Sequence, residues 1–283
     1  MAHQLPPLSD DDLVTEEIGD WGQEKYRLLS LYAQMFAASM KNKWNCRVYI
    51  DLFAGSGRSK IKGTNRLVAG SPLVALGVDP TFDKYIFCEK DPDKLLALKT
   101  RVSRDYRDAN VDFQPGDANV AIADILQKIP KYTKDFKVLS FCFVDPYNLK
   151  DLAFDTIDRL SKLFVDFLVL IATDMDAARN VSKYELPQSD VVERFLGVPT
   201  WRAEWRVAKD RREGFSSFLM QRFSEQMEAR GYIRAPIGET KLVRSTEKNL
   251  PLYRLALFSR HQRGKSFWEQ AKSYSDNQLG FKY

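Results

Sequence analysis

The segment CRVYIDLFAGSG, residues 46–57, leads from a short apolar run into an acidic residue and then into a glycine-rich turn. The apolar run is typical of a buried strand. Gly55 and Gly57 lie on either side of one serine, and glycines allow a backbone to turn sharply and to approach a ligand closely. We therefore interpret residues 46–57 as a strand followed by a ligand-binding turn.

The rest of the sequence alternates similar strand patterns with longer helical patterns. Strand patterns occupy residues 46–53, 83–90, 110–117, 137–145 and 165–172, and helical patterns occupy residues 71–78, 92–102, 119–129 and 152–163. Such alternation predicts a parallel sheet with helical crossovers, which binds ligands at the carboxyl ends of its strands. We therefore predict a doubly wound, Rossmann-like α/β fold.

Other patterns flank this alternation. Apolar residues at three- and four-residue spacings predict an amphipathic helix over residues 21–44, and the first twenty residues look loosely ordered. Toward the end, the sequence predicts helices near residues 190–196 and 213–229, antiparallel strands near residues 241–244 and 252–258, and a short terminal helix. We therefore expect a mostly parallel sheet with an antiparallel C-terminal hairpin.

Composition excludes several classes of protein. Hydrophobic residues make up 44% and charged residues 29% of the 283 residues, which favours a packed interior over a disordered or fibrous chain. The most apolar run, residues 164–172, contains Asp166 and is far shorter than the ~20 residues of a membrane-spanning helix. Acidic residues near the N-terminus stand where a signal peptide would have basic and apolar regions. We expect a cytoplasmic protein with no membrane partner.

The cysteines and histidines do not form a metal-binding pattern. Cys46, Cys88 and Cys142 lie far apart among apolar neighbours, which favours buried free thiols. His3 and His261 lie near opposite ends of the chain, and no group of cysteines and histidines has the spacing of a zinc site. We predict no metal.

Positive charge is concentrated near the C-terminus. Residues 201–283 contain 17 lysines and arginines but 9 aspartates and glutamates, whereas residues 1–200 contain 26 and 29. This surplus indicates either an anionic partner, DNA or RNA, or a solvated basic face. Trp201 and Trp205 could stack on a nucleic-acid strand beside a basic row, or they could pack inside while the basic residues are solvated. The row consists of Arg202, Arg206, Lys209, Arg211 and Arg212.

The glycine-rich segments of this chain can be compared with three nucleotide-binding motifs. A dinucleotide fingerprint would require glycine where Lys60 stands, and a phosphate-binding loop at residues 264–266 would require glycine in place of Ser259. The third motif, D-x-F-x-G-x-G, is matched fully and resembles the loop of class I S-adenosylmethionine methyltransferases. Its residues here are Asp51, Phe53, Gly55 and Gly57, with Ala54 between them.

Acidic residues also follow the next two strands. Glu89 stands at the end of its strand, where a carboxylate could accept hydrogen bonds from both ribose hydroxyls. Residues 61–69 read as an insertion, after which Ser71 is expected to cap the crossover helix and Pro72 to begin it. Asp117 could lie near an adenine amino group. Both carboxylates could instead be an ordinary surface charge and a helix cap. The resemblance implies an S-adenosyl-L-methionine site at Asp51, Phe53, Ala54, Gly55, Gly57, Glu89, Asp117 and Ala118.

The fourth strand ends in FVDPYN, residues 143–148. This segment resembles the Asp/Asn-Pro-Pro-Tyr/Phe signature of amino-group methyltransferases, with one proline instead of two. The amine of a base is a poor nucleophile because its lone pair is delocalised into the ring. The Asp145 carboxylate and the Pro146 carbonyl could orient it while Tyr147 stacks on the base. We predict these three residues to be catalytic; the alternative is a turn after a buried strand.

Longer segments resemble the three-Cys-motif partner protein family (TcmP). They are YIDLFAGSGRS (49–59), GSPLVAL (70–76), VDPYNL (144–149) and PLYRLALFSRHQRGKSFW (251–268), together with Trp21, Lys25 and Tyr32. The resemblance covers about residues 21–272. It implies a class I methyltransferase sheet, and it makes a companion three-cysteine-motif protein a possible partner. Where relatives often have Asp-Pro-Phe-Gly, this sequence has Asn148 in place of the glycine.

These patterns predict an S-adenosylmethionine-dependent methyltransferase that acts on an amino group, most plausibly of a DNA or RNA base. The alternative is a non-catalytic scaffold that keeps the methyltransferase fold and binds the companion protein, and a buried Tyr147 would favour it. A methyltransferase of small molecules or proteins is a third reading. We expect residues 1–45 to form a helical extension and residues 46–283 the methyltransferase-like domain, with an insertion at about residues 185–212.

Overall fold

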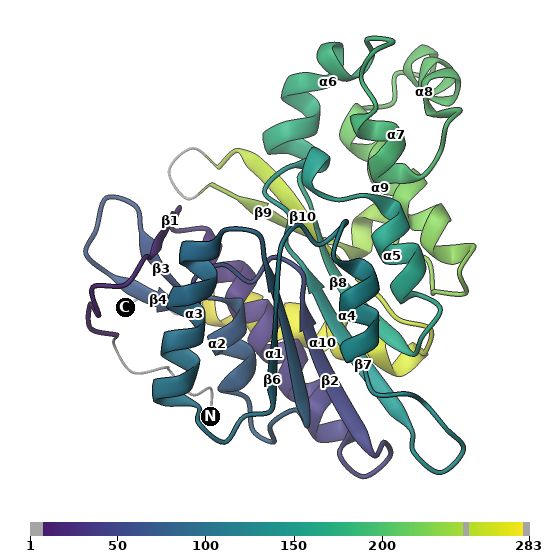
Figure 1. The fold of residues 1–283 in the computed structure, drawn as a ribbon. Coiled ribbons are helices and arrows are strands. Elements are labelled where there is room, and N and C mark those ends of the chain that lie inside the picture. The colour runs from purple at the N-terminus through teal and green to yellow at the C-terminus, as the bar shows by residue number, and fades with distance from the viewer. Residues whose placement is uncertain (1–7, 246–248, 280–283) are drawn as a thin grey trace. The chain divides into compact units, whose positions relative to one another are not determined.

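The computed structural model describes residues 8–245 and 249–279 (Figure 1). Its strands form a seven-stranded sheet in the order β6-β5-β2-β7-β8-β10-β9 and a three-stranded sheet in the order β1-β3-β4. The chain divides into two compact units, one made of the residues up to Phe143 together with those from Glu269, and one made of Val144–Trp268. The predicted division at residue 45, with an insertion at about residues 185–212, stays a prediction.

The first unit contains the parallel strands. They are β2 (Cys46–Asp51), β5 (Lys84–Glu89), β6 (Val111–Pro115) and β7 (Val138–Val144). β2 pairs with β5 and β7, and β5 pairs with β6, in each case in parallel. The helices between them are α2 (Ser71–Leu76), α3 (Pro92–Asp105) and α4 (Ile122–Lys128). Each of these strands and helices lies where the sequence predicts it.

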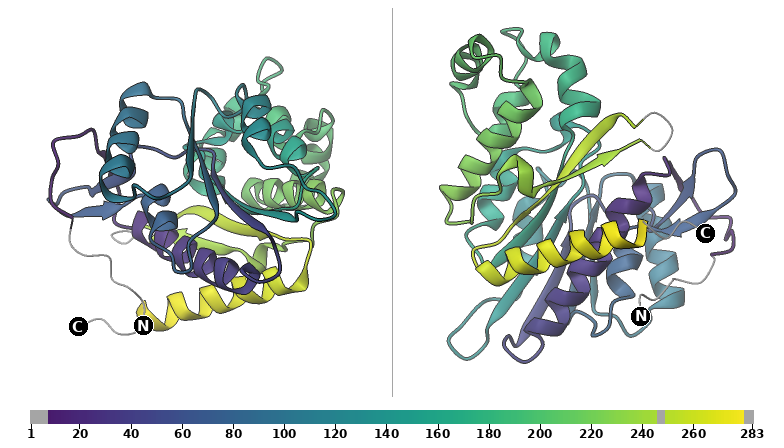
Figure 2. Two further views of the ribbon diagram at one scale, coloured as in Figure 1. Left: turned by 60° about the horizontal axis from the view of Figure 1, so that its bottom comes forward. Right: turned by 180° about the vertical axis from the view of Figure 1, so that it is seen from behind.

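An aromatic cluster forms the core of this unit. α1 (Gly22–Met40) places Tyr32 and Phe36 against Phe141 of β7, with ring centroids 4.9 and 5.5 Å apart. Tyr49 of β2 completes the cluster at 5.8 Å from Phe141. The helix α1 confirms the predicted N-terminal helix but ends at Met40 instead of residue 44. The C-terminal half of α10 (Gln262–Leu279) runs beside it, which Figure 2 shows from behind.

The small sheet corrects two expectations about the first unit. It consists of β1 (Glu16–Ile18), β3 (Arg58–Ile61) and β4 (Leu67–Ala69). β1 pairs in parallel with β3, so residues 16–18 belong to a sheet although the sequence reads as loosely ordered there. β3 and β4 form an antiparallel hairpin, and this hairpin contains most of the stretch that reads as an insertion.

The start of α2 corrects a third expectation. Gly70, and not Ser71, occupies the N-cap position, and no side chain caps the helix. Gly70 donates its N–H to the Gly57 carbonyl oxygen at 2.8 Å, and a Cβ on Gly70 would lie 3.2 Å from that oxygen. The helix therefore begins directly against the glycine-rich turn, where a side chain at position 70 would be crowded.

The second unit contains the antiparallel strands. β10 (Pro251–Phe258) pairs with both β8 (Val165–Ile171) and β9 (Lys241–Arg244). The helical elements here are η1 (Leu149–Asp151), α5 (Phe154–Leu160), the π-helix η2 (Thr173–Ala177), α6 (Ala178–Tyr184), α7 (Val191–Leu196), α8 (Trp201–Asp210), α9 (Phe215–Glu228) and η3 (Ile237–Glu239). The predicted mostly parallel sheet with an antiparallel C-terminal hairpin is therefore confirmed. The terminal helix α10, predicted to be short, has 18 residues.

The tryptophans of α8 are buried rather than available for stacking. Trp205 lies 4.9 Å from Phe215 between ring centroids, and Trp201 is fully buried. Arg202 donates to the Leu186 carbonyl oxygen at 2.9 Å. The alternative in which the tryptophans pack inside is therefore correct, and the proposed aromatic stacking surface is wrong. The basic residues of the row that are exposed are Arg206, Lys209, Arg211 and Arg212.

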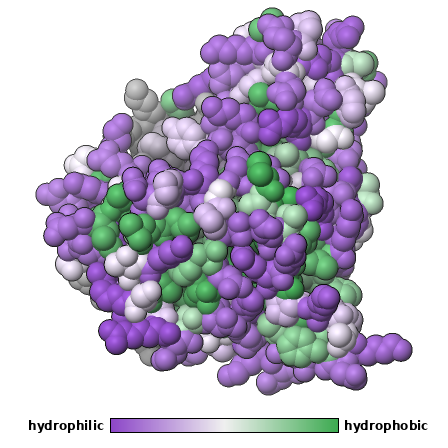
Figure 3. Space-filling model, in the orientation of Figure 1, coloured by the Kyte–Doolittle hydropathy of each residue, from purple (hydrophilic) through white to green (hydrophobic). Residues whose placement is uncertain are grey.

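The molecular surface seen in Figure 3 is mostly hydrophilic, with apolar residues gathered in several smaller areas. Large apolar side chains that are exposed include Leu96, Val120 and Tyr147. Across residues 8–245 and 249–279, no helix combines the length and the apolar character needed to cross a membrane.

Candidate functional site

The glycine-rich turn after β2 requires glycine at two positions. Gly55 has a φ of 62° and Gly57 a φ of 84°, both in the left-handed region that favours glycine. A Cβ on Gly57 would lie 2.8 Å from Leu98 Cδ1, and one on Gly55 would lie 2.8 Å from Glu16 Oε1. The turn is therefore closely surrounded, and its backbone conformation depends on the two glycines that the sequence motif specifies.

Asp51 and Ala54 anchor the two sides of this turn. Asp51 is fully buried, and its Oδ1 accepts a hydrogen bond from the Phe53 N–H at 3.2 Å. Its Oδ2 accepts one from the Tyr49 hydroxyl at 3.3 Å. Ala54 is buried and donates its N–H to the Cys88 carbonyl oxygen at 2.9 Å. The end of β2 is thus joined to the end of β5.

Glu89 connects the same two strand ends through its carboxylate. Its Oε2 accepts a hydrogen bond from the Gly55 N–H at 2.7 Å, and its Oε1 accepts one from the Asp91 N–H at 2.8 Å. A carboxylate has about four acceptor positions, so each oxygen keeps one for a ligand hydroxyl. Glu89 therefore holds the glycine turn in place and can still accept hydrogen bonds from a ligand.

The end of β6 contributes the third carboxylate. Asp117 Oδ1 accepts hydrogen bonds from the backbone N–H and the side-chain Nδ2 of Asn119, both at 2.8 Å. Gly116 donates its N–H to the Glu89 carbonyl oxygen at 3.0 Å, and Ala118 is buried. The loop after β6 is therefore attached to the end of β5.

The Cys88 thiol lies near the end of β5, in the field of these three carboxylates. Burial raises the pKa of Cys88 to about 12. The negative charges that add to this pKa rise are those of Glu89, Asp117 and Asp51. Backbone hydrogen bonds from Ala54 to Cys88 and from Gly116 to Glu89 join the ends of β2, β5 and β6. The structure thus brings together the residues predicted to bind the cofactor, as expected for a parallel sheet.

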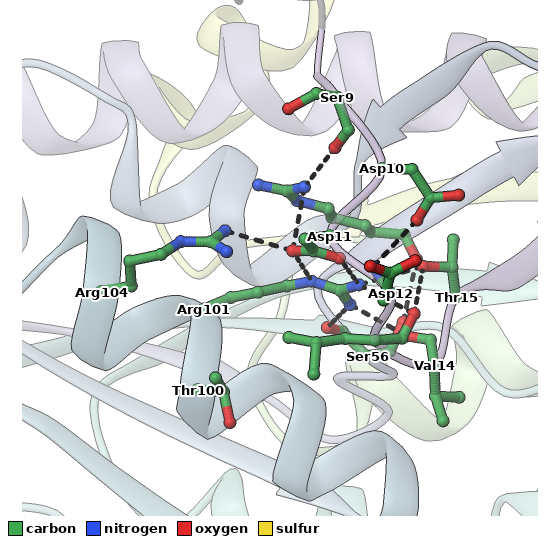
Figure 4. A network of polar contacts seen from close by, with 12 residues as sticks. Ser9, Asp10, Asp11, Asp12, Val14, Thr15, Ser56, Thr100, Arg101 and Arg104 are labelled. Carbon is green, nitrogen blue, oxygen red and sulfur yellow. Dashed lines mark hydrogen bonds and ion pairs between the residues drawn. The ribbon is translucent and has the colours of Figure 1, made fainter.

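An arginine that is not among the predicted site residues holds the N-terminal segment against this turn. Arg101 of α3 has no exposed surface, and it donates to both carboxylate oxygens of Asp11, at 3.0 and 2.7 Å (Figure 4). It also donates to the carbonyl oxygens of Val14, at 3.0 Å, and of Ser56, at 2.6 Å. Ser56 lies between the two glycines of the turn. A single buried guanidinium therefore fixes the segment of residues 9–18 to the glycine turn.

Further ion pairs surround this contact. Asp11 also pairs with Arg58 at 3.0 Å and with Arg104 at 3.1 Å. The hydrogen bonds from Arg101, with its charge, hold the pKa of Asp11 well below its usual range. On the same segment, Glu16 pairs with Lys94 of α3 at 2.9 Å.

The residues predicted to be catalytic belong to the second unit, whereas the cofactor residues belong to the first. β7 ends at Val144, and Asp145 follows it directly. Asp145 is half-buried, Pro146 is buried, and the Tyr147 side chain is 83% exposed. We call residues 145–148 the acceptor loop. Its aromatic ring is accessible, so the buried Tyr147 that would favour a scaffold is not observed.

Asn148 closes the acceptor loop. Its φ of −152° and ψ of 174° describe extended backbone, which any residue can adopt, so asparagine in place of glycine causes no strain. Its Oδ1 is enclosed and has no hydrogen-bond partner within the part of the chain that the structure describes. The next residue, Leu149, donates its N–H to Asp176 Oδ2 at 2.8 Å, and the sequence analysis did not select this aspartate.

The three cysteines are buried free thiols, as predicted. Burial raises the pKa of the Cys142 thiol, and the charge of Asp51 raises it further, so Cys142 is not a ready nucleophile. Within residues 8–245 and 249–279, no group of three or more histidine, cysteine, aspartate or glutamate side chains could hold a metal ion. His3 lies outside the described residues, and the absence of a metal stays a prediction.

Comparison with known proteins shows a distant likeness of fold. No protein-family model and no curated protein sequence matches this chain. Protein LPL1258 from Legionella pneumophila, with the family description DUF519, has a TM-score of 0.50 at 12% identity, over 90% of this chain and 93% of its own. The O-methyltransferase from Bacillus cereus in complex with SAH has a TM-score of 0.46 at 11% identity, over 87% and 84%. TYW2 from M. jannaschii in complex with AdoMet has a TM-score of 0.43 at 11% identity, over 86% and 78%.

The fold is an α/β fold with a seven-stranded, mostly parallel sheet, and it resembles that of LPL1258. At these identities the likeness concerns the fold alone.

Proposed function

We propose that this protein transfers the methyl group of S-adenosylmethionine to an amino group of a nucleic-acid base. The observation that carries the proposal is the exposed Tyr147 ring next to Asp145 and Pro146, directly after strand β7. An exposed tyrosine offers a flat surface on which a base can stack. A neighbouring carboxylate and carbonyl offer the acceptors that an amine needs.

The cofactor half of the proposal rests on the glycine turn and its carboxylates. Asp51 and Glu89 each form hydrogen bonds that shape the turn, and Glu89 retains acceptor positions for two ribose hydroxyls. Asp117 and Ala118 follow the next strand, where we place the adenine. When bound, S-adenosylmethionine supplies a methyl group made electrophilic by the positive charge of its sulfur.

The protein's task in this chemistry is orientation. Asp145 and the Pro146 carbonyl accept the amine's N–H groups and direct its lone pair toward the methyl carbon. With the methyl donor bound, the amine nitrogen would gain the N–C bond as the donor's S–C bond broke, and its proton would then pass to water. A strong base is unnecessary, because the nitrogen becomes acidic once it carries the extra bond.

The proposal is tested by incubating the protein with isotopically labelled S-adenosylmethionine and separate pools of DNA and RNA. Mass spectrometry of the digested nucleosides should show label on an exocyclic nitrogen in one pool. Label on a ring carbon or on a sugar oxygen would contradict the amino-group assignment. Absence of label from both pools, with methylated protein or small molecules instead, would contradict the nucleic-acid assignment.

A scaffold for a companion three-cysteine-motif protein is the second candidate. The longest segment of resemblance to the TcmP family, residues 251–268, forms β10 and the beginning of α10, and most of β10 is buried. The residues that carry this resemblance are therefore mostly core residues, and they leave the companion's binding surface open. If the protein is a scaffold, a Glu89→Ala variant should bind the companion normally. If it is a methyltransferase, that variant should lose methylation.

Glu89→Ala is expected to weaken S-adenosylmethionine binding by at least about tenfold. The variant removes a charged acceptor from two ribose hydroxyls, and each such hydrogen bond contributes ~1.5–3 kcal/mol. Isothermal titration calorimetry measures the affinity, and a nicotinamide dinucleotide should not bind either protein. Asp93→Ala is the matched control, since it removes an exposed carboxylate from the first turn of α3. Unchanged affinity in Glu89→Ala would contradict the assignment.

Nucleic-acid binding is expected to weaken as salt rises, because phosphate contacts release counterions. Replacing the exposed Arg206, Arg211 and Arg212 with glutamine should flatten the salt dependence by about one unit of slope for each arginine that pairs with a phosphate. Gel-shift titrations at several salt concentrations measure this slope. A control variant that replaces three exposed cations of the first unit, Arg107, Lys131 and Lys134, should keep the wild-type slope. No binding at low salt would favour a protein partner.

A further inference from the structure

A π-helix follows strand β8 without a connecting loop. Its residues are Thr173–Ala177, and the Ala177 N–H donates to the Ala172 carbonyl oxygen, five residues earlier, at 3.1 Å. Such wide turns are rare and are found frequently at functional sites. This one carries two aspartates, Asp174 and Asp176, which contact different parts of the second unit.

Asp174 contacts the π-helix itself and helix α9. Its Oδ2 accepts a hydrogen bond from the Thr173 hydroxyl at 2.8 Å, and its Oδ1 accepts one from the Ser216 hydroxyl of α9 at 3.1 Å. These contacts attach the π-helix to α9 and do not involve the acceptor loop. Asp174 therefore has a structural role that is separate from the loop.

Asp176 instead joins the π-helix to the acceptor loop. Its Oδ2 accepts a hydrogen bond from the Leu149 N–H at 2.8 Å. Its Oδ1 accepts from Asn180 Nδ2 at 2.8 Å and from the Tyr184 hydroxyl at 2.6 Å. Burial, with the hydrogen bond to Asp176 and its charge, raises the pKa of Tyr184 well above its usual range, so Tyr184 remains a donor. Asn180 and Tyr184 hold one carboxylate oxygen in place, and the other oxygen holds the loop.

The acceptor loop is consequently fixed at both ends. At its start, Asp145 follows the last residue of β7, and the Pro146 ring restricts the backbone. At its end, the buried Leu149 is held through its backbone by Asp176. Tyr147 lies between these two fixed points with its ring exposed, so its position depends on the backbone that both ends define.

We propose that Asp176 is a positioning residue that holds the acceptor loop in the conformation in which Asp145 and Tyr147 receive the base. The inference rests on the proposed function. Misplacing a reacting group by about 1 Å can lower a rate about 10²-fold, so a tether of this kind affects turnover although Asp176 does not touch the substrate.

The test compares three variants of the full chain. Asp176→Ala removes the tether, Asp176→Asn keeps one acceptor oxygen, and Asp174→Ala removes the neighbouring carboxylate of the same π-helix. Hydrogen–deuterium exchange of the peptide that covers residues 145–152 reports the tether without any need for activity. Exchange at Leu149 should be about tenfold or more faster in Asp176→Ala, because its amide no longer donates a charge-assisted hydrogen bond. Asp176→Asn should lie between wild type and Asp176→Ala, and Asp174→Ala should match wild type at this peptide.

Methylation kinetics provide the second readout. The kcat of Asp176→Ala should fall about 10- to 100-fold, with S-adenosylmethionine affinity and the KM for nucleic acid close to wild type. Asp176→Asn should recover most of this kcat. Unchanged exchange at residues 145–152 in Asp176→Ala would overturn the inference, and so would faster exchange with wild-type kcat. Absence of methylation by the wild-type protein would overturn the proposed function instead, and the exchange comparison would still decide whether Asp176 holds the loop.

Discussion

Asp145→Ala is expected to lower the rate of methyl transfer about 10²-fold or more, the usual cost of removing a positioned polar group from an active site. Asp145→Asn should retain measurable turnover, because one acceptor oxygen remains and the reaction does not require prior deprotonation of the amine. Single-turnover methylation with saturating S-adenosylmethionine measures both rates. Equal loss of rate in the two variants would instead identify Asp145 as a true general base.

Two variants of Tyr147 test the stacking surface in the same way. Tyr147→Phe should have a mild effect because the stacking surface remains, whereas Tyr147→Ala should lose ~1–3 kcal/mol of base stacking. The side chain is 83% exposed, so neither substitution should change the stability of the fold. Cofactor affinity should be close to wild type in all four variants. Wild-type rates in Asp145→Ala and Tyr147→Ala would exclude the acceptor loop as the reacting site.

The parallel strands could be predicted because they are buried on both faces. A strand such as β2 or β7 therefore reads as a continuous apolar run, and the helices between the strands show their own spacing. The sheet of β1, β3 and β4 could not be predicted in this way. Its strands have three or four residues each and include polar residues such as Glu16 and Lys60, so they have neither the length nor the pattern of a core strand.

The residues of the candidate site also differ in whether the sequence could reveal them. Glu89 and Asp117 could be selected because topology places the ends of successive parallel strands at one edge of the sheet. Asp11 and Asp176 could not, since their importance comes from contacts with Arg101 and Leu149 far along the chain. Arg101 itself was a signal in the sequence that a buried charge needs a partner. It stands at helical spacing from the apolar residues on the buried face of α3.

The tryptophan pair shows why a local pattern can support two opposite interpretations. Trp201 and Trp205 are four residues apart and therefore share a helix face. The sequence does not say whether that face meets solvent or another helix. Phe215 and Phe218 of α9 supply the second helix, and both tryptophans are buried. Arg206, Lys209, Arg211 and Arg212, which are exposed, are what remains of the predicted basic surface.

Asp11→Asn is expected to destabilise the first unit by about 3 kcal/mol, because removing one partner of a buried ion pair leaves the other charge uncompensated. Arg101 has no exposed surface, and the Asp11 side chain is 9% exposed, so water cannot replace the missing carboxylate without movement of residues 9–18. Asp12→Asn is the matched control. It removes one charge from the same acidic run at an exposed residue with a φ of 57°, a conformation that asparagine tolerates. Chemical denaturation of the two variants measures the difference.

The pH dependence of the stability difference between wild type and Asp11→Asn shows whether the ion pair causes it. The folded pKa of Asp11 lies below its ordinary value, so its ionised form stabilises the folded state above that ordinary pKa, and this contribution is lost as pH falls below about 4. Wild type and Asp11→Asn should therefore differ by a constant amount between about pH 5 and pH 8 and should converge in acid. Because Arg101 also donates to the Ser56 carbonyl oxygen, loosening residues 9–18 should free the glycine turn as well. A difference that persists unchanged at pH 2 would show that packing, and not the ion pair, is the source of the stability.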